Sequence, residues 1–295
     1  MAIKISLGPV LYYWSEEQLR TFYRQVATAP VDIVYLGETI CSKRRSLSSE
    51  QWIEIGHELQ AAGKEVVLST LALLEAESEL KQLRKICKQE NFLVEANDLA
   101  AVNIRSKAAT PFVVGHSINL YNQATLALLA RAGMSRWVLP VELSRETLSA
   151  LQQDRPEGIE TEVFGWGRLP LAYAARCYTA RHHGLPKDEC ELRCLDDPDG
   201  MVLKTKEGQP FLTLNGVQTQ SAQHHNLIGA VDEMTTLGVD IVRISPQSHF
   251  TMEVVQLFDQ VRREVMSGAA GKEATARYLP YGGVDGYWYG KAGIE

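Results

Sequence analysis

The chain has 295 residues, of which 45% are hydrophobic and 22% charged, so it is large enough to form a core without disulfide staples. Its net charge of −6 argues against non-specific nucleic-acid binding, and its longest apolar runs are far below the ~20 residues of a membrane span. Because five sparse cysteines do not suggest a secreted scaffold and the first residues lack a secretion signal, we expect a cytoplasmic protein with reduced thiols.

Short apolar runs alternate with amphipathic helical patterns along most of the chain, which predicts repeated β-α units around a parallel sheet. Between the first two runs, apolar residues recur at helical spacing from Leu19 to Val26. Ser48 and Gln51 have the form of a capping box at the start of the second helix. The eight predicted strands are residues 3–7, 31–36, 65–70, 92–95, 111–115, 136–139, 161–164 and 240–244. Eight such units predict an α/β fold, a (β/α)8 TIM-like barrel forming a single domain over residues 1–295.

The regular alternation of strands and helices is interrupted in two places. We expect an insertion over about residues 174–226, between the seventh and eighth strands, with a β-hairpin over residues 201–214 that turns at Glu207 to Pro210. The tail, residues 278–295, is rich in glycine and aromatic residues, so it is predicted to be irregular and to lie over the body of the protein or a partner.

In a parallel barrel the loops after the strands gather on one face, where active sites lie. Trp166 and Arg168 follow the seventh predicted strand. Candidates for catalysis from the other loops are Glu38, Asn97, His116, Asn119 and Glu142. For each of these residues, capping the next helix is the alternative role. Asp98 and Ser245 look most like plain caps.

The cysteines carry the strongest chemical signal. Three of them, Cys177, Cys190 and Cys194, lie in one polar segment, and Cys41 follows the second predicted strand as the best placed fourth donor. Four thiolates fit zinc or an iron-sulfur cluster, and His182 or His183 could replace Cys41 in a zinc site. The remaining alternative is a set of unrelated buried thiols. Cys87 falls on the apolar stripe of the third helix, where a thiol is usually a small hydrophobe.

Three basic residues, Lys43, Arg44 and Arg45, follow Cys41 closely. They could hold an anionic substrate or offset the negative charge of a thiolate-bound cluster. The alternative is a solvated basic surface. Hydrolytic chemistry has no support, because the chain has neither a complete His-Glu-x-x-His motif nor a Gly-x-Ser-x-Gly elbow.

Several stretches together resemble a known family. GETICSKRR around Cys41, GRLPLAYAARCYTARHHGLPKDECELRC from Gly167 to Cys194, the early KISLGPVLYYW and the late WYGKAG resemble the UbiV family of anaerobic ubiquinone-biosynthesis proteins. The resemblance runs over the full length. This family belongs to a superfamily once described as collagenase-like peptidases and now regarded largely as oxygen-independent hydroxylases.

The resemblance implies a 4Fe-4S cluster held by Cys41, Cys177, Cys190 and Cys194, with Cys87 as the non-ligand. It also implies a heterodimer with a UbiU-like paralogue that has its own cluster, and cooperation with a UbiT-like lipid-binding accessory protein. The implied activity is hydroxylation of the aromatic ring of ubiquinone-precursor lipids without dioxygen, with prephenate as a candidate oxygen donor. A dianionic donor would suit Lys43, Arg44, Arg45 or Arg168.

Two alternatives to a hydroxylase subunit stay open. Four protein thiolates would complete the coordination of a cluster, so the cluster or a zinc ion could be only a staple in a noncatalytic barrel that stabilises its paralogous partner. Peptidase activity is the third hypothesis, and it rests on the superfamily's older description alone.

Overall fold

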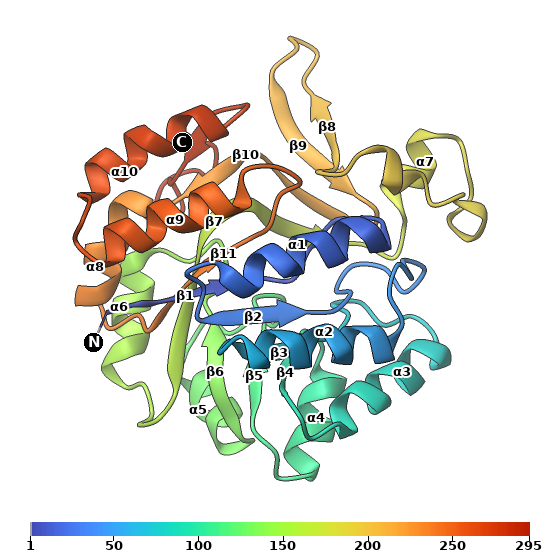
Figure 1. Ribbon diagram of the computed structural model, residues 1–295, viewed down its shortest axis with the longest axis horizontal. Coiled ribbons are helices and arrows are strands. Elements are labelled where there is room, and N and C mark those ends of the chain that lie inside the picture. Colours follow the sequence, from blue (N-terminus) through green and yellow to red (C-terminus); the bar gives the residue numbers. More distant parts are fainter. Residues whose placement is uncertain (1) are drawn as a thin grey trace.

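The computed structural model describes residues 2–295, and a closed barrel of parallel strands forms its centre (Figure 1). Seven strands pair in sequence order, and β11 closes the barrel by pairing with both β7 and β1. The barrel strands are β1 (Lys4–Leu7), β2 (Ile33–Leu36), β3 (Glu65–Ser69), β4 (Leu93–Ala96), β5 (Phe112–Val114), β6 (Met134–Val138), β7 (Glu160–Tyr173) and β11 (Ile241–Ile244). All eight strands predicted from hydrophobic runs are confirmed, and so is the TIM-like barrel.

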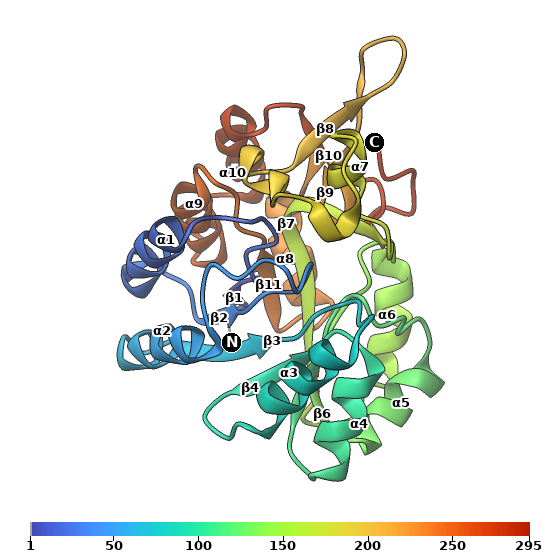
Figure 2. The same cartoon turned by 90° about the vertical axis from the view of Figure 1, so that its right-hand side faces the viewer.

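Helices cover the outside of the barrel (Figures 1 and 2). They are α1 (Glu16–Thr28), α2 (Ser49–Ala61), α3 (Glu77–Lys88), α4 (Leu99–Lys107), α5 (Gln123–Arg131), α6 (Arg145–Gln153), α8 (Val231–Thr236), α9 (Thr251–Arg262) and α10 (Gly268–Thr275), with the short η3 (Ile228–Ala230) before α8. The predicted capping box of α2 is present, since Ser48 Oγ accepts from the Gln51 N–H at 3.2 Å. Within residues 2–295, none of the helices is long and apolar enough to cross a bilayer.

The barrel wall separates two apolar layers, because successive side chains of a strand point to opposite faces. Ile33 and Tyr35 point into the barrel, where they pack with Val67 of β3. Val34 and Leu36 point outward and belong to the larger core beneath the helices. This alternation leaves the interior narrow and places most of the apolar packing outside the strands.

The insertion between β7 and β11 contains short helices followed by antiparallel strands. Its elements are α7 (Tyr178–His182), η1 (Lys187–Glu189), η2 (Arg193–Asp196), β8 (Met201–Lys204), β9 (Pro210–Asn215) and β10 (Gln218–Asn226). The predicted hairpin is confirmed as β8 and β9, and it projects from the body in both views (Figures 1 and 2). Strand β10 was not predicted, because QTQSAQHHN has no apolar alternation. It pairs antiparallel with β9 and with β7, which runs nine residues past the predicted end at residue 164.

The C-terminal segment is largely irregular and lies against the body. After η4 (Ala276–Tyr278), the short β12 (Gly283–Val284) pairs with β10. Trp288 is 2% exposed, and its indole N–H donates to Glu233 Oε2 of α8 at 2.8 Å. These contacts place the tail across α6, α8 and the insertion.

Candidate metal centre and barrel mouth

The loop after β2 carries the first of the candidate thiols. Gly37 has φ +116°, and a Cβ there would lie 2.9 Å from the Ser69 carbonyl oxygen, so only glycine lets the chain turn this close to β3. Glu38 Oε1 then accepts from the backbone N–H groups of Ile40 at 2.8 Å and Cys41 at 3.0 Å. The carboxylate therefore holds the loop in the conformation that presents Cys41.

The insertion carries the other three thiols on short helical turns. Cys177 is the N-cap of α7, and its Sγ accepts from the Ala180 N–H at 3.4 Å. Glu191 and Leu192, between Cys190 and Cys194, have φ of 50° and 53°. Two successive non-glycine residues in the left-handed region are costly, and such a conformation persists only where the surrounding structure requires it. This turn connects η1, whose C-cap is Cys190, to η2, which contains Cys194.

The four thiols share one electrostatic environment. Burial raises the pKa of the Cys41 thiol, and the charge of Cys177 raises it further. The pKa of Cys194 is likewise raised first by burial and also by Cys177, while Arg44 opposes the shift. The pKa of Lys43 is raised mainly by its hydrogen bond to Asp188 and then by the charges of Cys190 and Cys41. Cys41 and Cys177 also pack against one apolar cluster of Leu11, Ile40 and Val217, so the Cys41 loop and the insertion lie side by side.

Two basic residues connect the Cys41 loop to its surroundings. Lys43 Nζ donates to the Lys187 carbonyl oxygen and to Asp188 Oδ1, both at 2.8 Å. Arg44 is 5% exposed. Its guanidinium donates to the Leu11 carbonyl oxygen at 2.8 Å and to Asn215 Oδ1 at 2.7 Å.

These contacts give Lys43 and Arg44 protein partners, which suits charge compensation beside the thiols better than substrate capture. Arg45 is exposed, and its Nε donates to the Ser42 carbonyl oxygen at 3.2 Å. Arg168 is buried and donates to the Asp199 carbonyl oxygen. Of the four predicted substrate-binding residues, Arg45 is exposed, Lys43 is partly exposed, and Arg44 and Arg168 are buried.

The thiols do not form a compact single-ion site. Within residues 2–295, no group of three or more His, Cys, Asp or Glu side chains is arranged to hold one metal ion. In a 4Fe-4S cluster each thiolate binds a different iron, so the four sulfurs are spaced around the cluster instead of around one ion. A single zinc ion requires all its ligands within about 2.3 Å of one point. By donor chemistry alone, four cysteine thiols with Lys43 and Arg44 near them suit such a cluster.

Cys87 lies apart from this centre. It is 2% exposed on α3, packed in the main core, and burial raises the pKa of its thiol to about 11. The prediction that it is a small buried hydrophobe is confirmed.

The five residues predicted as catalytic candidates differ in burial, and Glu38 and His116 are half-buried. Asn97 Nδ2 donates to the Thr70 carbonyl oxygen at 2.9 Å, and its Oδ1 accepts from Ser117 at 3.2 Å. Asn119 and Glu142 are exposed, and Glu142 accepts from the Tyr121 hydroxyl. The structure therefore does not bring Asn119 and Glu142 to the buried polar groups of the barrel mouth, which is the end of the barrel where the strands lead into their loops.

The two predicted helix caps have opposite outcomes. Asp98 is confirmed, since its Oδ1 accepts from the Ala100 N–H at 2.7 Å at the start of α4. Ser245 is not a cap, because its buried hydroxyl has no hydrogen-bond partner and α9 begins after Phe250. The chain runs on for six residues after β11 before the helix starts, which sequence spacing did not reveal.

A buried ionic network inside the barrel was missed from sequence. Arg243 of β11 donates to Glu162 Oε1 at 2.6 Å and to Glu95 Oε1 at 2.8 Å. The Tyr35 hydroxyl donates to Glu162 Oε2 at 2.5 Å, and the guanidinium of Arg243 lies 4.0 Å from the centre of the Tyr35 ring. Charged residues inside apolar strand runs were the available signal, since a buried charge needs a partner.

His116 lies near this network and contacts Tyr173 at the end of β7. Burial, with a further contribution from Arg243, lowers the pKa of His116 to about 4, so the imidazole is neutral near pH 7. Its Nε2 lies 3.2 Å from the Tyr173 hydroxyl, which accepts from Gln218 Nε2 at 2.9 Å. If the tyrosine donates its proton to Nε2, then Nδ1, which has no partner, carries the ring proton. In that tautomer Nδ1 is a buried neutral donor without a protein partner.

The chain matches one family model and is similar to several solved structures. A family model described as peptidase family U32 matches residues 14–280. The chain is similar to the U32 peptidase Mk0906, at 12% identity and a TM-score of 0.46, covering 84% of this chain and 94% of that one. It is also similar to dihydropteroate synthase from Thermus thermophilus, at 13% identity and a TM-score of 0.44, covering 88% of this chain and 94% of that one.

Proposed function

The chain belongs to peptidase family U32, and from that membership we propose that it is the iron-sulfur subunit of an oxygen-independent hydroxylase. The proposed substrates are ubiquinone precursors, hydroxylated on the aromatic ring. The proposed partners are a UbiU-like paralogue, as the second half of a heterodimer, and a UbiT-like lipid carrier. Prephenate is the proposed source of the hydroxyl oxygen. These finer assignments derive from the sequence resemblance.

The observation that supports this proposal most is that the Cys41 loop lies against the insertion that carries the other three cysteines. The two segments are more than 130 residues apart, and thiols placed together without forming a disulfide suit a soft metal centre. A bound 4Fe-4S cluster would supply electron transfer. Cys41, Cys177, Cys190 and Cys194 would hold it, while Lys43 and Arg44 would offset the negative charge of the thiolates.

The residues of the barrel mouth would act on the ligand itself. Neutral His116 can donate a hydrogen bond to an oxygen of a substrate through Nδ1. Tyr173 and Gln218 occupy the space on the other side of the half-buried imidazole. A polar ligand that enters the mouth would therefore be oriented by these side chains before reaction.

One observation favours a second candidate, a noncatalytic barrel with a metal staple. The Cys41 loop and the insertion are already joined by Lys43, and four thiolates would add a further cross-link between them. In that case the centre stabilises the chain and its paralogous partner. The family name also indicates peptidase activity, for which no motif or geometry in residues 2–295 gives specific support.

Anaerobic purification with iron, sulfide and zinc analysis tests the cofactor. Brown protein with four iron and four sulfide per chain, which bleaches with dithionite, is the expected result. Colourless protein with one zinc per chain would contradict it.

The Cys190→Ser variant, with Cys87→Ser as the matched control, then separates the two candidates. If the centre acts in electron transfer, Cys190→Ser abolishes ring hydroxylation and leaves the heterodimer intact. If the centre is a staple, Cys190→Ser also prevents folding and assembly. Cys87→Ser should retain both metal and activity.

A further inference from the structure

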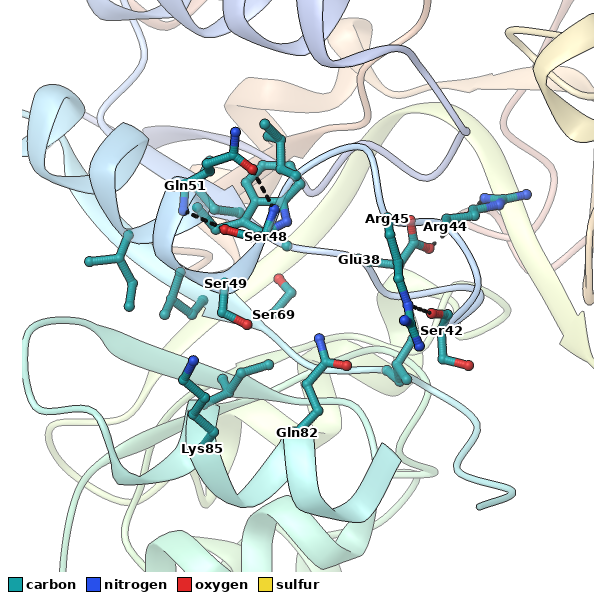
Figure 3. A pocket seen from close by; sticks show the side chains of 18 of the residues that line it. Glu38, Ser42, Arg44, Arg45, Ser48, Ser49, Gln51, Ser69, Gln82 and Lys85 are labelled. Carbon is teal, nitrogen blue, oxygen red and sulfur yellow. Dashed lines mark hydrogen bonds and ion pairs between the residues drawn. The ribbon is translucent and has the colours of Figure 1, made fainter. Parts of the chain in front are cut away.

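A cavity of about 630 Å³ lies between α2 and α3, outside the barrel wall (Figure 3). Helix α2 packs on α1, and α3 packs on α4, whereas α2 and α3 make few contacts with each other. Protein interiors are normally close-packed, and voids larger than a water molecule are few. A space of this volume has the size of a small-molecule site.

The inner walls of the cavity are apolar. Leu36 and Leu68 form its floor from the outward faces of β2 and β3. The helices and loops around them contribute Leu47, Trp52, Ile53, Leu71, Leu74, Leu83 and Ile86. None of these side chains is among the large exposed hydrophobics of residues 2–295. The apolar surface is therefore recessed, which suits a slender chain that enters the cavity better than the flat face of another protein.

The rim of the cavity is polar and bridged at two points. Lys85 of α3 pairs with Glu50 of α2 across the opening. Ser42 Oγ, in the loop that carries Cys41, donates to Glu79 Oε1 of α3 at 2.6 Å. An exposed ion pair such as Glu50–Lys85 contributes little to stability, so the opening can widen at low cost.

One end of the cavity touches the loop of the candidate metal centre. Glu38, Ser42 and Arg44 all line it, and Figure 3 shows Glu38 and Arg44 side by side at that end. The Glu38 carboxylate also accepts from the backbone N–H of Cys41. A ligand in the cavity would thus be separated from the thiols by a single loop.

We propose that this cavity binds the hydrocarbon chain of an amphiphile, with the polar end of the ligand toward Glu38, Ser42 and Arg45. Burial of methylene groups against leucine and isoleucine side chains provides the affinity. The rim presents cations and carboxylates together, which favours an uncharged polar head. That the ligand is the hydroxylation substrate rests on the proposed function, whereas the occupancy of the cavity does not.

Binding of phenols that carry one, two or three isoprene units to the anaerobically purified full-length protein tests the proposal. Isothermal titration calorimetry should show affinity rising by about tenfold or more with each unit, because every unit buries further apolar area. A phenol that carries a straight saturated chain of similar length serves as a second probe with the same head. Tighter binding of the three-unit phenol assigns the site to isoprenoids, and the reverse order assigns it to straight alkyl chains.

Two variants fill the cavity from opposite sides, Ile53→Trp on α2 and Leu74→Trp before α3. Each should weaken binding of the three-unit phenol at least about tenfold. The matched control, Glu58→Trp, lies on an exposed position of α2 that does not line the cavity and should bind as the parent does. Urea midpoints identify any variant that is misfolded.

Affinity independent of chain length, or parent-like binding by both folded cavity variants, would overturn the proposal. Failure of the cavity assignment can be distinguished from failure of the proposed function. Chain-length-dependent binding by a protein without hydroxylase activity retains the cavity assignment. Unchanged hydroxylation by Ile53→Trp and Leu74→Trp would overturn only the assignment of the cavity ligand as the hydroxylation substrate.

Discussion

Lys43 donates from the loop after β2 to the carboxylate of Asp188 in the insertion, 145 residues later, at 2.8 Å. The same ammonium group donates to the Lys187 carbonyl oxygen at 2.8 Å. This pair of contacts joins the two segments that carry the candidate ligands. The Cys41 loop and the insertion therefore have a protein link that does not depend on a bound cofactor.

Removing that link should weaken retention of the cofactor without unfolding the barrel. In Lys43→Met, we expect iron loss to a chelator to be measurably faster than in the parent, followed by the decay of visible absorbance. Arg45→Met is the control, because Arg45 is exposed and its Nε contacts only the Ser42 carbonyl oxygen. Equal rates for Lys43→Met and Arg45→Met would show that the link is dispensable.

Arg44→Met should reduce the stability of the whole protein. It leaves the half-buried Glu38 carboxylate without its cation, and it removes the donors to Leu11 and Asn215. We expect the free energy of unfolding to fall by about 3 kcal/mol, as for other broken buried ion pairs. Urea unfolding followed by circular dichroism measures this, and Arg44→Lys should lie between the parent and Arg44→Met. A midpoint unchanged in Arg44→Met would contradict the role assigned to this residue.

Removal of the cofactor should loosen the insertion before the barrel. The segment around Cys190 contains the exposed Arg181 and the partly exposed Lys187 and Arg193. Its protein anchors include Lys43, the ion pair of Lys187 with Glu75, and Asp199 with Ser248. After chelation, we expect trypsin to cleave within residues 181–193 while the barrel stays protected. Mass spectrometry of the fragments locates the cuts. Uniform digestion of the whole chain would show instead that the centre supports the entire fold.

Breaking the ionic network in the barrel should be costly. Arg243→Met leaves Glu95 and Glu162 buried without a cation, so we expect a loss of about 3–5 kcal/mol in the free energy of unfolding. Adding Glu162→Gln removes one of the two uncompensated charges and should restore part of that loss. A double variant less stable than Arg243→Met would show that Glu162 contributes through hydrogen bonds to Ser6 and Tyr35 instead.

Stability should decline in mild acid. Burial lowers the pKa of His116 and His225 to about 4 and that of His224 to about 3, against 6.5 for an ordinary histidine. As pH falls through 6.5 the unfolded chain takes up protons that the folded protein does not, so the free energy of unfolding falls until about pH 4. His116→Asn should make this decline shallower between pH 6.5 and 4, measured by urea midpoints. An unchanged slope would mean that His116 is protonated in the folded protein.

Local pattern determined most of the secondary structure in advance. Apolar runs located the eight barrel strands, and helical spacing identified the buried face of α1 from Leu19 to Val26, because these signals depend on neighbouring residues only. The grouping of Cys177, Cys190 and Cys194 was likewise visible from their positions in the sequence, and so was the place of Cys87 on the apolar face of α3.

Tertiary structure alone decided which residues meet. Strand β10 forms from a polar segment because β7 and β9 satisfy its backbone, and Arg243 is tolerated in the barrel because Glu95 and Glu162 converge on it. The partners of Lys43 and the gap between α2 and α3 depend on closure of the barrel, which sets distances between segments far apart in the chain. Periodicity in the sequence shows which face of a helix or strand is apolar. The charge pairs and the cavity form only when these faces pack together in the folded protein.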